Sequence, residues 1–459
     1  MLRSMKRSSL LLISLVALIH AAFFIVYQRP DWHVEVAWTD QDGYRRLGEV
    51  LAATGRFTRY PDSPVFVPEV IRTPGYPAFV ATVYRIAGVS HLAVAIAQAF
   101  VFAAICLLVY GIARAATSER VALAAAAVTA LFPPIPYFGA LVLTEVWTTL
   151  MLSGALLVCL RATKSGRVRD FAIAGLLFGC TTLVRPAFVL LPFGLALGLP
   201  ILVPAERRTG QRLVGWATLA VVGGLTLVPW LTYNYVYLGR FTLSPAGGVG
   251  RGLWEGSWQG RWPGRVHAQL TAIADEEIPR QMLDARVQTV AANTKFPAET
   301  MLDYVHEWRD IRRIWEEPTD PMTRARARVT ADEEYLRAAR RHIGEDVPGW
   351  AVRRLTRGLF VLWASDIPIR YSDINATPTW IIRLLWLAQV GLLAAAAVGL
   401  ATLVTRGRFT QAALLALPLL YVTAVHLPLL CETRQSLPTK PIVLVLATIG
   451  GARLKHAAL

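Results

Sequence analysis

The chain has 459 residues, of which 54% are hydrophobic and only 17% are charged, whereas soluble domains contain roughly 45–50% apolar and about 25% charged residues. This composition excludes an ordinary soluble protein. Lysine and arginine outnumber the acidic residues by 47 to 31, for a net charge of +16. A basic excess often indicates a nucleic-acid partner. Here the apolar residues gather in segments long enough to cross a bilayer, so we expect a lipid bilayer and no nucleic acid as the partner.

Ten apolar segments have the character of membrane-spanning helices. Crossing the hydrocarbon core takes roughly 17–25 residues, and the runs close to that length are residues 9–27, 91–113, 120–137, 142–160, 170–184, 186–203, 213–236, 379–404, 409–427 and 438–453. We therefore predict an all-α fold, a polytopic membrane helical bundle of about ten transmembrane helices.

Every second connection between these segments is rich in arginine and lysine, including the N-terminal stretch, residues 161–169 and the C-terminal stretch. By the positive-inside rule this face is cytoplasmic. Both termini then lie in the cytoplasm of a plasma membrane, which we take to be a bacterial inner membrane. The first segment has the basic start of a signal peptide, but no small-residue cleavage site follows it. We therefore expect it to be an uncleaved span.

This topology divides the chain into three parts. Residues 1–236 form an N-terminal transmembrane module with a first outer loop at 28–90. Residues 237–378 form an extracytoplasmic segment, and residues 379–459 form the C-terminal transmembrane helices. Apolar residues at three- and four-residue spacing predict surface helices in the first outer loop and soluble helices at 277–293, 297–315 and 321–342.

Residues 350–363 have the pattern of a basic amphipathic helix. Their apolar side chains and their arginines are predicted to lie on opposite faces, with Leu355, Leu359, Phe360 and Trp363 on one and Arg353, Arg354 and Arg357 on the other. Such a helix rests on a membrane surface, so we expect this one on the outer leaflet.

Carboxylates occur at the predicted outer ends of spans, where an ionisable group near hydrocarbon usually faces a cavity or a pathway. Asp40 and Asp42 follow the first span by about a dozen residues, and Glu145 stands at the start of the fourth. A carboxylate at a helix start also serves as an N-cap, which is the alternative for Asp40 and Asp42. A structural ion pair is the alternative for Glu145.

Cations share the same predicted face. They are Arg72 in the turn Arg72-Thr73-Pro74-Gly75-Tyr76-Pro77, Arg185 at the end of the fifth span, and Arg434 and Lys440 near the outer end of the last. Binding of lipid headgroups is the alternative for Arg72, and simple snorkelling is the alternative for Arg185. Cations suit a phosphate, and a carboxylate suits a hydroxyl that must lose its proton.

At these residues the chain resembles the C superfamily of glycosyltransferases, within it the protein O-mannosyltransferases and lipid A aminoarabinose transferases. The resemblance is carried, in matching order, by Asp40 with Tyr44 four residues later, Arg72 to Pro77, Glu145, the Gly-rich span Gly175 to Pro186, and Arg434 to Pro441. Two positions depart from the pattern. Gln41 replaces the second acid of an Asp-Glu pair, and Gln435 replaces an aromatic.

The resemblance implies an integral-membrane enzyme that transfers a hexose or pentose, with inversion, from a polyprenyl-phosphate-linked donor to an acceptor hydroxyl on the outer face. The acceptor is a glycan, a lipid or a protein, although Gln41 argues against a protein. Asp40 is the candidate base, with Asp42 in reserve, and Glu145 orients the acceptor or a cation. Arg72 and Arg185 bind the donor phosphate, with Arg434 as a weaker third.

Further residues are candidates for substrate contact. Tyr44, Tyr76 and Lys440 belong to the matching motifs, and Trp254 and Trp258 lie in a Gly-rich stretch that is predicted to be a mobile loop stacking on sugars. An interfacial aromatic belt is the alternative for the tryptophans. No cofactor is firmly implied. A divalent cation remains open, while no histidine and cysteine spacing indicates zinc.

Two other classes of protein compete with the enzyme. A transporter or flippase of lipid-linked glycans would line a path deep in the membrane and show repeated halves with interrupted helices. A structural subunit of an envelope assembly would explain the outer segment but not the gathering of acids and cations on one face.

Overall fold

The computed structural model describes residues 2–28, 40–202, 210–369, 373–374 and 376–457. Over these residues every regular element is helical. The bundle contains α1 (Leu2–Gln28), α4 (His91–Ala116), α5 (Glu119–Ala130), α7 (Glu145–Ser165), α8 (Val168–Val184), α9 (Leu191–Leu202), α10 (Gly210–Leu225), α11 (Val228–Leu238), α19 (Thr379–Thr405), α20 (Phe409–His426) and α22 (Lys440–Ala457). The prediction of an all-α helical fold is confirmed.

Seven helical stretches in the described residues are long and apolar enough to cross a membrane. They are Arg7–Gln28, His91–Ala116, Glu145–Ser165, Gly210–Leu238, Thr379–Thr405, Phe409–His426 and Thr433–Leu454. The other three predicted segments contain the shorter helices α5, α8 and α9. Helix α5 ends at Ala130, before the predicted limit of 137, because Pro133 and Pro134 lack the N–H groups that would continue it. The short helix α6 (Pro134–Gly139) follows.

Small residues let the bundle helices approach closely. Helices α19 and α22 make the most extensive helix pair, and a Cβ at Gly399 of α19 would overlap the carbonyl oxygen of Leu446 in α22. Likewise, a Cβ at Gly450 of α22 would overlap the carbonyl oxygen of Ala395 in α19. Such close contact of backbones is the usual source of helix association within a bilayer. The last helix is thereby fixed in the bundle.

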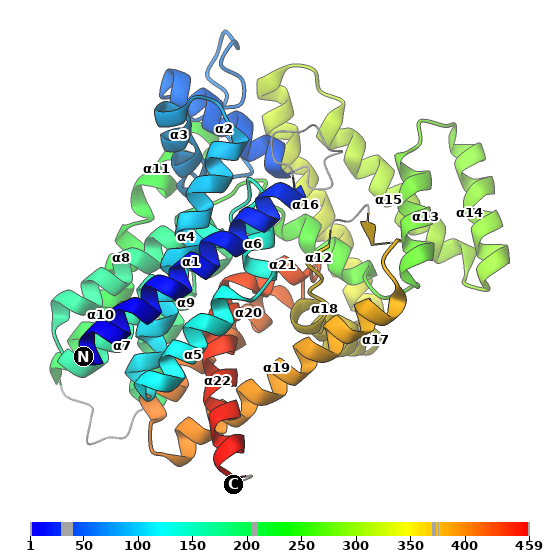
Figure 1. Cartoon of the computed structure of the whole chain (residues 1–459). Helices are drawn as coiled ribbons and strands as arrows, with labels where there is room; N and C mark the ends of the chain where they lie inside the picture. The colour runs from blue at the N-terminus through cyan, green and yellow to red at the C-terminus, as the bar shows by residue number, and fades with distance from the viewer. Residues whose placement is uncertain (1, 29–39, 203–209, 370–372, 375, 458–459) are drawn as a thin grey trace.

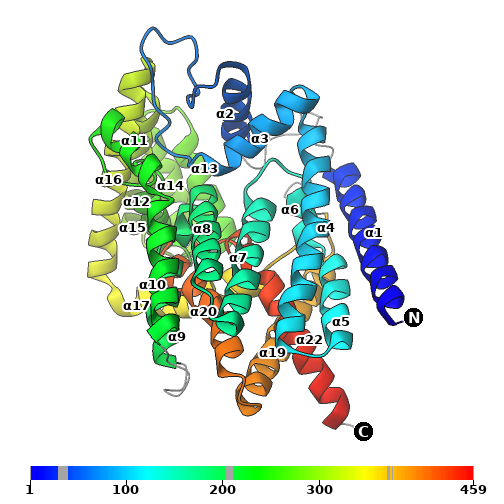
Figure 2. The same cartoon turned by 90° about the vertical axis from the view of Figure 1, so that its left-hand side faces the viewer.

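The first outer loop forms two helices, α2 (Asp40–Thr54) and α3 (Gly75–Ala87), which pack against each other at one end of the bundle. Figure 2 shows them at the opposite end from the C-terminus of α22. Leu47 of α2 and Val80 of α3 are fully buried. This loop is therefore a packed part of the fold, with Asp40 at the first turn of α2.

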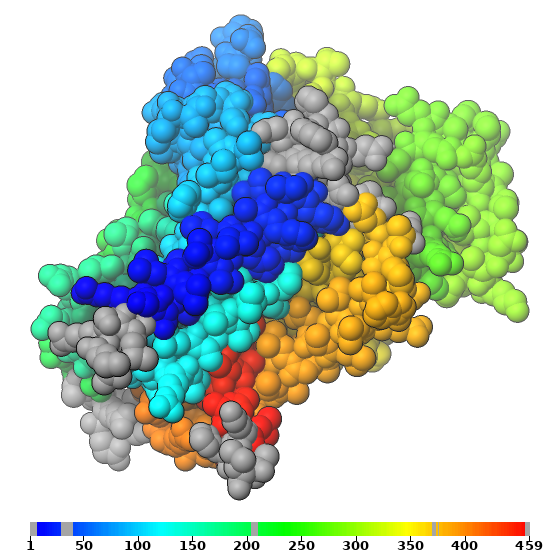
Figure 3. All heavy atoms as spheres, in the orientation of Figure 1, coloured from blue at the N-terminus to red at the C-terminus, as the bar shows by residue number. Residues whose placement is uncertain are grey.

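The outer segment forms a helical lobe beside the bundle (Figure 1). Its helices are α12 (Val249–Trp258), α13 (Gly264–Asp275), α14 (Arg280–Thr294), α15 (Ala298–Glu316), α16 (Pro321–Glu345), α17 (Val347–Arg353) and α18 (Leu359–Ala364). The three predicted soluble helices correspond to α14, α15 and α16. Figure 3 shows α13 and α14 projecting from the molecule as the outermost part of this lobe.

Trp254 and Trp258 belong to the core of this lobe. Both side chains are completely buried, and Trp254 stacks on Tyr304 with ring centres 5.4 Å apart. The Nε1 of Trp254 donates to Glu307 Oε2 at 2.7 Å. The prediction of a mobile, sugar-stacking loop is wrong here, because both residues lie on helix α12 and bury large apolar surfaces among α15 and α16. The alternative of an interfacial aromatic belt does not fit either, because the rings of such a belt contact lipid headgroups and these two side chains are completely buried.

The predicted division of residues 350–363 into two faces is also wrong. Arg354 is 2% exposed, whereas Leu355 is 59% exposed. The guanidinium of Arg354 donates to the carbonyl oxygens of Gln259 at 2.6 Å and Leu429 at 3.0 Å. A π-helical turn, η3 (Arg354–Gly358), interrupts the segment. The wider turn changes which residues share a face.

Candidate active site

A cavity of about 520 Å³ lies at the end of the bundle that carries α2 and α3. It gathers segments that are far apart in the sequence: the first outer loop, the start of α7, the end of α8, the end of α20 and the short helix α21 (Thr433–Ser436). Its charged lining residues are Asp40, Arg72, Glu145, Arg185 and Arg434. Five of the six acids and cations predicted for catalysis and donor binding therefore line one cavity.

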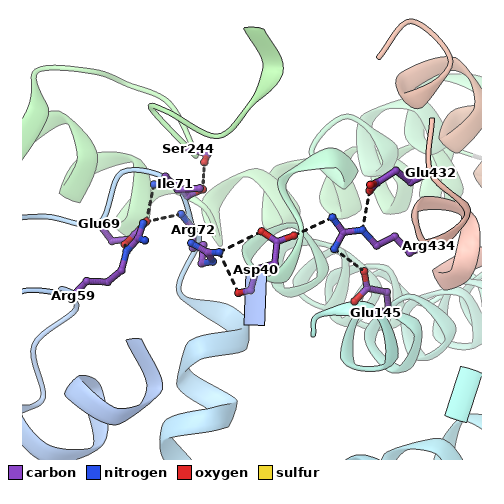
Figure 4. A network of polar contacts seen from close by, with 9 residues as sticks. All are labelled: Asp40, Arg59, Glu69, Ile71, Arg72, Glu145, Ser244, Glu432 and Arg434. Carbon is purple, nitrogen blue, oxygen red and sulfur yellow. Dashed lines mark hydrogen bonds and ion pairs between the residues drawn. The ribbon is translucent and has the colours of Figure 1, made fainter. Parts of the chain in front are cut away.

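Asp40 lies between two arginines (Figure 4). Its Oδ1 is 3.3 Å from Nη2 of Arg72, and its Oδ2 is 2.9 Å from Nη2 of Arg434. Desolvation opposes ionisation of this carboxyl, but the charges of Arg434 and then Arg72 outweigh it, and the pKa of Asp40 is held below its ordinary value. Asp40 is thus an ionised carboxylate, still 45% exposed at its side chain, at the mouth of the cavity.

Asp42 does not reach the cavity. Its side chain is 59% exposed and contacts Arg45 at 3.4 Å on the surface of α2. The two-residue separation from Asp40 rotates Asp42 by about 200° around a helix of 3.6 residues per turn. The reserve role predicted for Asp42 is therefore wrong, and its position in the first turn suits the helix dipole.

The turn that carries Arg72 is fixed by a buried ion pair. Glu69 is paired with Arg59 through two contacts of 2.5 and 2.8 Å, and its Oε1 also accepts from the backbone N–H of Ile71 and of Arg72. Burial opposes ionisation of Glu69, but Arg59 dominates and holds its pKa below the ordinary value. The Oγ of Ser244 donates to the Ile71 carbonyl. The sequence reasoning missed Glu69 and Ser244, although Glu69 stands three residues before the arginine.

Arg72 itself faces inward. Its side chain is 8% exposed, its guanidinium lies 4.7 Å from the ring centre of Tyr44, and its Nε is buried without a hydrogen-bond partner among the described residues. Binding of surface lipid headgroups, the alternative for this residue, does not fit that orientation. Tyr44 lines the cavity as expected, through the ring that supports Arg72.

Arg434 is the central cation of the site. Its Nε lies 2.8 Å from Glu432, its Nη2 contacts Asp40, and its Nη1 is 3.9 Å from Glu145 Oε1. Glu432 was missed by the sequence reasoning. It forms a reciprocal capping box with Gln435 at the start of α21, and that spacing is readable from a sequence. The box also accounts for Gln435, whose amide closes it where the related motif has an aromatic.

Glu145 and Arg185 form the deeper part of the site. Glu145 is the first residue of α7 and its side chain is 2% exposed, with Oε1 3.9 Å from Nη1 of Arg185. Its Oε2 has no hydrogen-bond partner in the described part of the chain. Nη1 of Arg185 also donates to the Arg434 carbonyl at 3.4 Å. Both contacts of the Arg185 guanidinium are long. Of the three arginines that line the cavity, Arg72, Arg185 and Arg434, it therefore carries the least neutralised charge.

Two residues predicted to contact substrate, Tyr76 and Lys440, have structural contacts instead. Tyr76 is completely buried and donates to Gln98 Oε1 at 3.1 Å. Lys440 is completely buried, and its Nζ lies 3.0 Å from Asp366 Oδ2. Neither lines the cavity, so the prediction that they bind substrate is wrong. Gln41 accepts a hydrogen bond from the Val142 N–H at 2.9 Å and so joins α2 to the loop before α7.

Comparison with known proteins supports the assignment of the fold. Residues 71–233 match the family model described as dolichyl-phosphate-mannose-protein mannosyltransferase. This range contains Arg72, Glu145 and Arg185 but not Asp40 or Arg434. No curated protein matches the chain.

Two solved structures of the Archaeoglobus fulgidus oligosaccharyltransferase show the same fold. The enzyme AglB in complex with an inhibitory peptide and a dolichol-phosphate has 13% sequence identity and a TM-score of 0.55, with 100% of this chain and 52% of that chain covered. The structure tethered to an acceptor peptide has 14% identity and a TM-score of 0.55, with 98% and 50% covered. The chain thus spans about half the length of these structures.

The chain has the fold of the C-superfamily membrane glycosyltransferases, and the resemblance stated from the sequence is confirmed. The similarity to the mannosyltransferase family model is limited to residues 71–233, about a third of the chain. The apolar helices are those of a multi-pass membrane protein.

Proposed function

We propose that this protein is a glycosyltransferase that moves a sugar from a polyprenyl-phosphate donor to an acceptor hydroxyl, with inversion, on the outer face of the membrane. The observation that carries the proposal is the cavity itself, which joins the charged cluster to an apolar wall formed by Pro186, Ala187, Val189, Leu190, Val425 and Leu429. Leu190 is 60% exposed at the edge of the bundle. A phosphate attached to a hydrocarbon tail fits such a divided cavity.

In this mechanism the acceptor oxygen bonds to the anomeric carbon from the face opposite the phosphate. Asp40 takes the hydroxyl proton, and the bond between the anomeric carbon and the phosphate oxygen breaks with its electrons going to the phosphate. Base assistance of this kind accelerates a reaction roughly 10²–10⁴-fold. Arg185 and Arg72 stabilise the charge on the departing phosphate.

The ion pairs of the site support this division of roles. Among the described residues, the guanidinium of Arg185 has only long contacts, and the Nε of Arg72 has no hydrogen-bond partner. An entering phosphate competes with Asp40 for Arg72, because both are anions. That competition releases one oxygen of Asp40 to face the acceptor hydroxyl. Arg185 then contributes more to phosphate binding than Arg434, which three carboxylates already share.

A divalent cation stays a prediction for this site, and the mechanism that we propose relies on a guanidinium. Among the described residues no group of three or more histidine, cysteine, aspartate or glutamate side chains converges as a metal site. Asp40 and Glu145 both face Arg434, whose guanidinium fills the space between them. No step is assigned to a metal.

The decisive experiment follows the donor. Purified protein in liposomes is given a polyprenyl-phosphate sugar labelled in the sugar, with and without candidate glycan, lipid and peptide acceptors. We expect free polyprenyl phosphate and a labelled acceptor to form in equal amounts. Movement of intact donor between leaflets without its consumption would contradict the proposal and support a flippase.

A further inference from the structure

A second cavity, of about 430 Å³, lies at the opposite end of the bundle. It is lined by the end of α4, the start of α5, the connection between α19 and α20, and the end of α22. In Figure 2 the end of α4, the start of α5 and the C-terminal part of α22 lie together at the bottom, away from α2 and α3. Four arginines line the cavity: Arg114, Arg406, Arg408 and Arg453.

The positive charge of this cavity is almost uncompensated. No carboxylate is among its lining residues, and among the described residues the one acidic contact of these arginines is Glu119, 3.9 Å from Arg114. Arg408 donates to the Ala116 carbonyl at 2.8 Å, and Arg453 donates to the hydroxyls of Thr402 and Thr405 at 3.3 Å. Carbonyls and hydroxyls orient a guanidinium but do not neutralise it.

The guanidinium of Arg406 makes no hydrogen bond or ion pair with the residues that the structure describes, although its backbone N–H donates to the Thr402 carbonyl. The general preference for basic residues on the cytoplasmic face explains why arginines occur at this end. It does not explain why four of them, from three distant parts of the chain, surround one cavity. Arg161 and Arg169 lie at the same end, on α7 and α8, and do not line it.

The remaining lining residues indicate where the ligand comes from. Ser118, the residue before α5, brings the positive end of that helix dipole to the cavity. Val121 and Ile449 add apolar surface from α5 and α22. The cavity therefore joins a concentrated positive charge to the flank of the membrane-spanning helices. Basic pockets between such helices bind the phosphates of acidic lipid headgroups.

We propose that this arginine cavity binds the headgroup of an anionic phospholipid, with its phosphate held by Arg406, Arg408 and Arg453 and its acyl chains along α5 and α22. The site is distinct from the proposed donor site, and its occupancy does not depend on whether sugar transfer occurs.

The test measures lipid binding without any reaction. Purified, delipidated protein is placed in nanodiscs of phosphatidylcholine that contain cardiolipin or phosphatidylglycerol, and lipid retained by the protein is quantified by native mass spectrometry. We expect either acidic lipid to be retained over phosphatidylcholine. We expect the Arg406→Gln/Arg408→Gln variant to lose affinity at least tenfold, since each arginine near acidic lipid contributes about fivefold.

The matched control is Arg161→Gln/Arg169→Gln, which removes the same charge from the same end of the molecule. We expect this control to retain acidic lipid like the unaltered protein. Equal losses in both variants would show a general surface effect and overturn the proposal. Displacement of the lipid by inorganic phosphate alone at comparable concentration would also overturn it, because the site would then serve a soluble anion. Arg406→Lys, which keeps the charge, should retain most of the affinity and shows that the fold is intact.

Discussion

The two charged cavities of this protein lie at opposite ends of the bundle and surround their arginines with different partners. After the predicted topology, we call the cavity lined by Asp40 and Glu145 the outer cavity and the cavity lined by Arg406 and Arg408 the inner cavity. In the outer cavity each arginine faces at least one carboxylate, as Arg434 faces Asp40, Glu145 and Glu432. In the inner cavity Arg408 and Arg453 are held by neutral groups, and within the described part of the chain only Arg114 of the four arginines has a carboxylate within 4 Å. Balanced charges allow a site to exchange one anion for another during a reaction. Unbalanced charges favour lasting occupancy by an anion.

The largest expected effect is in the outer cavity, at the proposed base. Asp40→Asn should lower kcat for sugar transfer roughly 10²–10⁴-fold, because the amide cannot accept the acceptor proton. The measurement is release of labelled sugar to acceptor at saturating donor. Asp42→Asn is the matched control, since it makes the same change two residues away on the surface and should leave kcat unchanged. Equal losses in the two variants would remove Asp40 from the mechanism.

The next effect concerns the least neutralised cation of the outer cavity. Arg185→Gln should weaken donor binding about tenfold to a hundredfold, because a hydrogen bond to a charged group contributes about 1.5–3 kcal/mol. Donor binding is measured directly by titration without acceptor. Arg406→Gln in the inner cavity is the control and should leave donor affinity unchanged. Weaker donor binding in the Arg406 variant would mean that the two cavities do not act separately.

A smaller effect is expected from the residue that positions Arg72. Glu69→Gln removes the charge that pairs with Arg59 but keeps an oxygen for the N–H groups of Ile71 and Arg72. We expect the KM for donor to rise about tenfold with a smaller change in kcat, because Glu69 does not touch the cavity. A variant in which kcat falls as in Asp40→Asn would instead make Glu69 part of the chemistry.

The smallest effect is a shift in pH dependence. The charges of Arg434 and Arg72 lower the pKa of Asp40, so this carboxylate stays ionised as pH falls through the ordinary aspartate value of about 3.9. The acid limb of kcat/KM, which reports the free enzyme, should therefore lie below that value. Arg72→Gln removes one cation, raises the pKa of Asp40 and moves the limb to higher pH.

Arg45→Gln is the control for the pH profile, because Arg45 is on the same helix but contacts Asp42. An acid limb that stays in place in Arg72→Gln would show that another group controls it. No such pH dependence is expected for the inner cavity, because no carboxylate is among its lining residues.

Much of the fold was predictable because it rests on local patterns. Spans are marked by runs of apolar residues, and the soluble helices α14, α15 and α16 by apolar spacing. The candidates Glu145 and Arg185 were found because an ionisable residue at the end of an apolar run is conspicuous, and Asp40 because it stands four residues before Tyr44 in the first outer loop. The predictions for Lys440 and Trp254 were wrong because the surroundings of these side chains are formed by residues far away in the sequence. The anion beside Lys440 is Asp366, 74 positions earlier in the chain, and the core around Trp254 is built by helices α15 and α16.

The sequence by itself determined that this chain is a helical membrane protein with acids and cations at the ends of its helices, since hydropathy and charge are properties of individual segments. Only the tertiary structure decided which of those charges meet. It turned Asp40 toward Arg72 and Arg434 and Asp42 away, buried Lys440 in an ion pair, and brought four arginines around the inner cavity. The physical reason is that a charge near hydrocarbon needs a partner or water, and which one it finds depends on how the helices pack.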